Sequence, residues 1–99
     1  MITVRIRSIL TMKRILGKEE FDMSLPEGST LDDLLSSMIR GRGDELSSRL
    51  VNLDGRGPAE QARVTRVMIN GRDIEFLNGL ETVLHEGDEI LILPILSGG

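Results

Sequence analysis

The chain has no cysteine, tryptophan or tyrosine, and its 99 residues include one histidine and two phenylalanines. Without cysteine it cannot form disulfides, thiolate nucleophiles or zinc–thiolate centres. No segment approaches the roughly 18 consecutive apolar residues of a membrane-spanning helix, so we expect no association with a membrane. The first ten residues place arginines within their apolar stretch, which is atypical of a signal peptide, so we expect a cytoplasmic protein.

The charge pattern argues against two further classes of site. The net charge is −4 and the ten arginines are scattered rather than clustered, so we expect no nucleic-acid partner. His85 lies among acidic residues, but without the spacing of a metal-binding sequence, so we expect no metal site and no bound cofactor. At this length the chain is predicted to fold as one domain, residues 1–99, with a flexible tail at 95–99.

Four segments have the patterns of strands. Residues 2–7 and 21–25 alternate apolar and polar side chains, which indicates strands with one buried face. Residues 64–69 form a third strand followed by Asn70-Gly71, a strong hairpin-turn signal. The last strand is expected at residues 90–93, with residue 95 as the alternative end. Between the first two strands we expect one helical turn ending at Gly17, with the apolar residues of 8–18 packed on the core.

One segment has the pattern of an amphipathic helix. Thr30 and Asp33 fit a capping box at its start, and Arg40 with Gly41 is expected to end it. An apolar stripe follows the spacing of one helix face: Leu31, Leu34, Leu35, Met38 and Ile39. In the polar segment 41–62, Leu46 and Leu50 suggest one more short helix. The order of elements predicts an α+β fold, a β-grasp whose mixed sheet of four to five strands clasps one main helix.

The chain ends in two glycines, Gly98 and Gly99. Because glycine has no Cβ, this dipeptide can thread a channel one backbone wide and present its terminal carboxylate. A carboxylate is a poor electrophile and needs activation, most simply by adenylation. Nothing in the sequence indicates that the chain activates itself, so we expect it not to be an enzyme.

Several segments resemble the MoaD/ThiS family of ubiquitin-like sulfur carriers. They are LPEGSTLDDLL (residues 25–35), VMINGRDI (67–74), LETVLHEGDEILILP (80–94) and the terminal SGG. The resemblance implies that a MoeB/ThiF-like adenylyltransferase of the ubiquitin-activating type uses ATP and Mg²⁺ to adenylate Gly99. A persulfide or sulfide donor then converts the adenylate into a thiocarboxylate. The sulfur acceptor favoured by the resemblance is a molybdopterin synthase large subunit.

The resemblance also implies roles for the tail and for one sheet face. Gly98 and Ser97 would thread into the partner, and Ser97 to Gly99 are expected to be disordered in the free protein. Alternation along the strands places Leu91, Leu93 and Met68 on the outer sheet face. Together with Ile95 and Leu96 they are the predicted partner-binding residues, unless residues 41–62 cover them.

Other interpretations of the ending stay open. The single Pro94 departs from the double proline usual in MoaD proteins, whereas the length and the 41–62 segment suit them better than the compact thiamin-pathway carriers. The chain could instead serve thiazole synthesis or another thiolation pathway. It could also be a protein modifier that conjugates Gly99 to lysines, or an interaction module whose terminal glycines are incidental.

Overall fold

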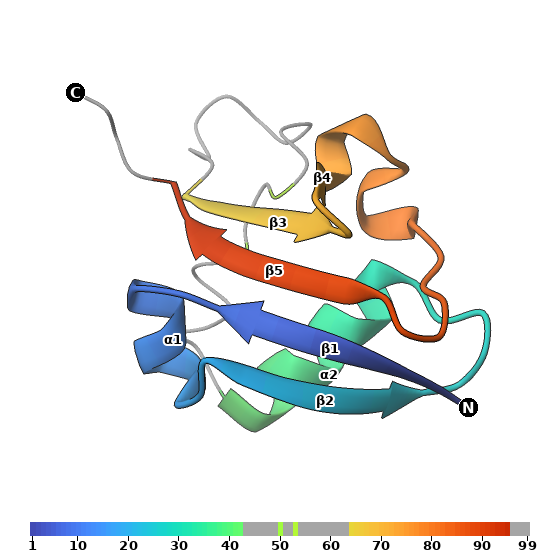
Figure 1. The fold of residues 1–99 in the computed structure, drawn as a ribbon, viewed down its shortest axis with the longest axis horizontal. Coiled ribbons are helices and arrows are strands. Elements are labelled where there is room, and N and C mark those ends of the chain that lie inside the picture. The colour runs from blue at the N-terminus through green and yellow to red at the C-terminus, as the bar shows by residue number, and fades with distance from the viewer. Residues whose placement is uncertain (43–49, 51–52, 54–63, 96–99) are drawn as a thin grey trace.

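A computed structural model describes residues 1–42, 50, 53 and 64–95. Its five-stranded sheet has the order β2-β1-β5-β3-β4, with one face covered by helix α2 (Figure 1). The strands are β1 (Ile2–Ser8), β2 (Glu20–Leu25), β3 (Thr65–Ile69), β4 (Arg72–Asp73) and β5 (Glu89–Pro94). The helices are α1 (Thr11–Leu16) and α2 (Leu31–Arg42), with two short 3₁₀ helices, η1 (Ile74–Phe76) and η2 (Gly79–Glu81).

The first and last strands lie side by side at the centre of the sheet. β1 pairs with β5 in parallel, from Arg5 opposite Glu89 to Ser8 opposite Ile92. β5 pairs with β3 in the antiparallel sense, and β2 pairs with β1 in the same way. The predicted β-grasp is therefore confirmed. Because β1 and β5 run in the same direction, their carboxyl ends meet at one edge, where α1 packs against them (Figure 1).

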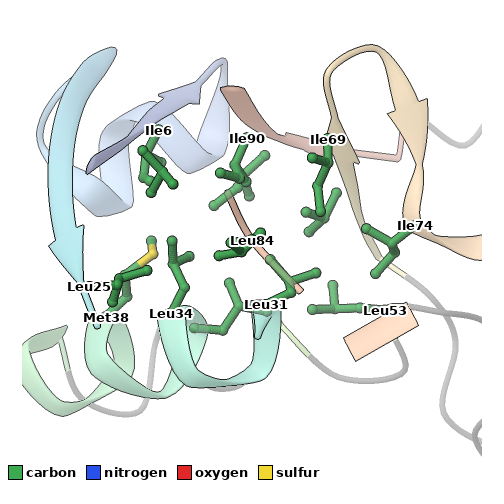
Figure 2. Close-up of a cluster of buried hydrophobic side chains, with 14 of the residues drawn as sticks. Ile6, Leu25, Leu31, Leu34, Met38, Leu53, Ile69, Ile74, Leu84 and Ile90 are labelled. Atoms are coloured by element: carbon green, nitrogen blue, oxygen red, sulfur yellow. The ribbon is translucent and has the colours of Figure 1, made fainter. Parts of the chain in front are cut away.

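A single cluster of aliphatic side chains fills the space between the sheet and α2 (Figure 2). The predicted helix stripe lies here: Leu31, Leu34, Leu35 and Met38 are buried, and Ile39 is partly buried. The sheet contributes the inward apolar residues of β1, β2, β3 and β5, and Leu53 and Leu84 add two further buried leucines. The core therefore contains residues from both α-helices, from the sheet and from the connecting segments.

Two local signals are confirmed in atomic detail. The amide of Thr30 donates to Asp33 Oδ2 at 2.9 Å, and the Asp33 amide donates to Thr30 Oγ1 at 3.3 Å, which is a reciprocal capping box. Asn70 and Gly71 have φ values of 51° and 86°, as a type I′ turn requires, and they join β3 to β4.

Several boundaries differ from the sequence prediction. Gly41 does not end α2, because the helix continues to Arg42. Leu10 is not packed on the core but is 58% exposed, with φ at 55°, because it precedes α1 at the outer end of the connection. We predicted a tail from residue 95, yet Ile95 is held to the sheet: its amide donates to the Val64 carbonyl at 3.0 Å.

Most of the segment 41–62 is not described by the structure, so the short helix predicted around Leu46 lies outside the described residues. Leu50, which is described, packs partly buried against the core. None of the described helices combines the length and the apolar character needed to cross a membrane.

Candidate functional site

The predicted reactive end follows the central strand. β5 ends at Pro94, opposite Thr65 of β3, and Ile95 is the last described residue. Leu96, Ser97, Gly98 and Gly99 lie outside the described residues, and so does the expectation that 97–99 are disordered. The described geometry therefore fixes the place from which the tail departs: the edge of the sheet where the carboxyl ends of β1 and β5 meet.

Three of the predicted partner-binding residues lie together on the sheet face opposite α2. Leu91 is directly opposite Met68 of β3, and Leu93 lies opposite Arg66. Leu91, Leu93 and Met68 are each half-buried, whereas Ile90, Ile92 and Val67, which point to the other face, are fully buried. Ile95 is also half-buried and lines a shallow hollow with Arg66, Leu93 and Pro94. We call the group Met68, Leu91, Leu93 and Ile95 the apolar strip.

The same sheet face is charged on the other side of β5. Arg5 Nη1 lies 3.0 Å from Glu20 Oε1 and Arg5 Nε 3.2 Å from Asp22 Oδ1, while Arg7 Nη1 lies 3.1 Å from Glu89 Oε1. The pKa of the Arg5 guanidinium is raised above its ordinary value. The largest cause is the hydrogen bond to Asp22, and the second is the negative charge of Glu20. The strands β1 and β2 thus present charges that already have partners within the domain.

The acidic turn before β5, residues 85–88, stabilises the fold through hydrogen bonds. Asp88 Oδ2 accepts from the His85 amide at 2.8 Å, and Asp88 Oδ1 accepts from Asn70 Nδ2 at 2.9 Å. Glu86 Oε1 accepts from the Thr3 amide at 3.1 Å. These bonds fix the start of β5 against β1 and against the β3–β4 turn. In the part of the chain that the structure describes, no three His, Asp or Glu side chains are arranged to hold a metal ion.

One exposed side chain was not predicted. Phe76 of η1 is 80% exposed and lines a hollow that also includes Met68, at the edge of the apolar strip. From sequence, residues 74–82 are predicted to be a connection anchored by Ile74, Leu77, Leu80 and Val83. The structure confirms the first three, whereas Val83 is 46% exposed and does not anchor the connection. No periodic pattern in that segment distinguishes an outward from an inward apolar residue, so its sequence carried no signal for Phe76.

The fold, with its half-exposed apolar strip, identifies the class of protein. It is a ubiquitin-like β-grasp protein whose C-terminal residues come after the central strand, β5. The chain belongs to the ThiS family, described by a model that matches residues 11–99. The predicted membership of the MoaD/ThiS sulfur carriers is thereby confirmed.

Two curated relatives show what such chains do elsewhere. The chain is 28% identical to small archaeal modifier protein 3 of Haloferax volcanii over 96 residues, covering 97% of this chain and 98% of the relative. It is 32% identical to the sulfur carrier protein CysO of Mycobacterium tuberculosis over 72 residues, covering 73% of this chain and 74% of the relative. These relatives are small carriers and modifiers, so this chain is a protein of that kind and not a catalyst.

Solved structures agree on the fold. The solution structure of small archaeal modifier protein 1 from Methanosarcina acetivorans has a TM-score of 0.71 at 29% identity, covering 100% of this chain and 98% of that one. A chain of the BexX/CysO complex of Amycolatopsis orientalis has a TM-score of 0.69 at 23% identity, covering 97% and 99%. At that lower identity the likeness shows the fold alone, while the complex itself shows that a protein of this fold associates with a partner.

Proposed function

We propose that this chain is a sulfur carrier that works through a thiocarboxylate at Gly99. A MoeB/ThiF-like adenylyltransferase would first adenylate the terminal carboxylate, and sulfur from a persulfide or sulfide donor would then replace the adenylate. The carrier would finally deliver this sulfur in the active site of an acceptor enzyme. The observation that carries the proposal is the Gly98-Gly99 ending, two glycines at the end of a ThiS-family chain.

The chemistry follows from the carboxylate. An oxygen of Gly99 attacks the α-phosphorus of ATP, and pyrophosphate leaves to give the acyl adenylate. Hydrosulfide then attacks the carbonyl carbon, the bond to the adenylate oxygen breaks, and AMP leaves with the bonding pair. With a persulfide as donor, a reductant of the thiol class must cleave the sulfur–sulfur bond. This chain contributes the carboxylate and the narrow glycine thread, and the partner contributes the catalytic groups.

The apolar strip is the proposed docking surface for these partners, together with Leu96, which lies outside the described residues. Half-exposed leucines and a methionine on a sheet face form an apolar patch next to the tail, and such patches commonly mark partner sites. The position supports the proposal because Leu93 and Ile95 lie where the tail departs, so a partner that takes up the tail must approach them.

The test is the intact mass of the protein after incubation with the adenylyltransferase of its own host, ATP, Mg²⁺ and sulfide. We expect a gain equal to the mass difference between sulfur and oxygen, located on Gly99 by fragmentation. A variant with one alanine added after Gly99 is the matched control and should remain unmodified. An unmodified natural protein under conditions where the enzyme activates another carrier would contradict the proposal.

A second candidate is the protein modifier, because the match to the Haloferax volcanii modifier covers nearly the whole of both chains. An activated Gly99 could be attacked by a lysine amine, which would form an isopeptide bond. Digestion of host proteins followed by mass spectrometry would detect Gly-Gly remnants on lysines that require the Gly99 end. Conjugates through this chain's own lysines, Lys13 and Lys18, would support the same function.

For the sulfur acceptor we propose a molybdopterin synthase large subunit. The support is the sequence resemblance to the MoaD branch, in particular the length of the chain. Deleting the gene should then abolish molybdoenzyme activity in the host, and the gene with its Gly99 codon intact should restore it. Loss of thiamin synthesis or of another thiolated product, with molybdoenzymes unaffected, would assign the carrier to that pathway instead.

A further inference from the structure

We infer that Phe76 is a second anchor for the adenylating partner, whose contact surface runs from β5 across β3 toward β4 and not toward β2. The inference rests on the proposed function and adds a residue and a direction to it. It predicts that the partner presents a bulky apolar side chain to the hollow beside Phe76.

The backbone that carries Phe76 is fixed by hydrogen bonds and by a buried neighbour. Ile74, two residues earlier, is fully buried and ties η1 to the core. Asp73 Oδ1 caps η1 by accepting from the Glu75 amide at 2.9 Å, and the Leu77 amide donates to the Ile74 carbonyl at 3.0 Å. Because the backbone around Phe76 is already fixed, a partner that covers this 80% exposed side chain has to order the ring alone and not the segment that carries it.

The hollow beside Phe76 joins it to the apolar strip. Met68 and Arg66 line the hollow together with Phe76, and Met68 lies directly opposite Leu91 of the strip. Arg66 Nε is held 3.0 Å from Asp73 Oδ2, a carboxylate that is 9% exposed, while the Arg66 side chain remains 48% exposed. An aromatic ring beside a fixed guanidinium and a methionine is typical of the residues that anchor protein interfaces.

The charges decide the direction in which the contact surface extends. Toward β2, a partner would cover Arg5 and Arg7 together with the carboxylates that they already contact, and removing such ion pairs from water costs free energy without forming new contacts. Toward β4, the partner would also cover one ion pair, Arg66–Asp73, but its carboxylate is already only 9% exposed, so little of it remains to be removed from water. On that side the partner would in addition cover Met68 and Phe76, whose burial is favourable. We therefore expect the partner's apolar side chain to contact the sheet on the β4 side of β5.

The experiment measures the KM for the carrier in ATP–pyrophosphate exchange catalysed by the adenylyltransferase of the same host. We expect Phe76→Ser to raise this KM by at least about tenfold with kcat unchanged, because the contact is made on docking and not during adenylation. Phe76→Leu should recover most of the affinity. The melting temperature should not change, since Phe76 is exposed.

Two control variants mark the boundary of the contact surface. Val83→Thr also replaces an exposed apolar side chain, at 46% exposure, and lies beside Thr30 before α2, outside the lining of the hollow. Arg5→Gln removes a charge from the β1–β2 side. Both are expected to leave the KM within about twofold of the natural protein, as for a residue outside the interface.

Failure of this inference is distinguishable from failure of the proposed function. If the natural protein supports no exchange with an active enzyme, the proposed function is wrong. If it does support exchange and Phe76→Ser has an unchanged KM, the anchor is wrong and the function stands. A larger effect of Arg5→Gln than of Phe76→Ser would overturn the direction toward β4.

Discussion

At the scale of single residues, strand parity separates the buried apolar side chains from the half-exposed ones. Ile90 and Ile92 are fully buried against α2, whereas Leu91 and Leu93, their neighbours in β5, are half-buried on the other face. Aliphatic side chains of the same strand thus have two different roles. The inward residues stabilise the domain, and the outward residues are available to a partner.

Leu93 is the strip residue best placed to test docking. Leu93→Asp should weaken binding to the adenylating partner by at least about 2 kcal/mol, or about 30-fold in Kd, because it places a charge in an apolar contact. Calorimetric titration measures the affinity, and circular dichroism checks that the domain remains folded. An unchanged Kd would remove Leu93 from the interface.

Leu35 tests the inward set. It is 3% exposed on α2, so Leu35→Ala should lower the free energy of unfolding by about 2 to 5 kcal/mol through lost burial and the cavity left behind. Urea denaturation measures the change. A loss below about 1 kcal/mol would show that α2 packs less closely on the sheet than the structure indicates.

At the scale of elements, signals carried by a few adjacent residues predicted the structure best. The Thr30–Asp33 capping box and the Asn70-Gly71 turn were both recognised from sequence, because each depends on contacts within four residues. The end of α2 was misplaced, since a glycine such as Gly41 can continue a helix as well as end it.

The capping box gives a prediction at this scale. Thr30→Ala should lower the free energy of unfolding by about 0.5 to 2 kcal/mol, because the Asp33 amide loses its acceptor at the start of α2. Ser37→Ala, an exposed position within the same helix, is the control and should change stability by less than about 0.5 kcal/mol. Equal effects of the two variants in urea denaturation would argue against the cap.

At the scale of the whole molecule, the parallel pairing of β1 and β5 sets where the tail departs. The central strand is held by neighbours on both sides, and Ile95, the last described residue, is still hydrogen-bonded to Val64. A tail attached to a strand fixed on both sides has a well-defined origin. This is the property that the proposed function requires of a domain that inserts its C-terminus into another protein.

The tail can be tested without touching the core. Gly98→Trp should abolish adenylation, because a bulky side chain cannot enter a channel that fits only backbone. The melting temperature should stay the same, and Ser24→Ala, an exposed change on β2, should keep full activity in pyrophosphate exchange. Full activity of Gly98→Trp would mean that the terminal glycines are not threaded into the enzyme.

The sequence by itself determined four of the five described strands, the main helix, its cap, the hairpin turn and the ThiS-family ending. These follow from periodicity and from contacts between near neighbours, which a linear sequence contains. Only the tertiary structure placed Phe76 beside Met68, joined Arg66 to Asp73, and put the ion pairs of Arg5 and Arg7 on the opposite side of β5 from Met68. The physical reason is that exposure and ion pairing across strands depend on which distant segments become neighbours, and the pairing of strands decides that.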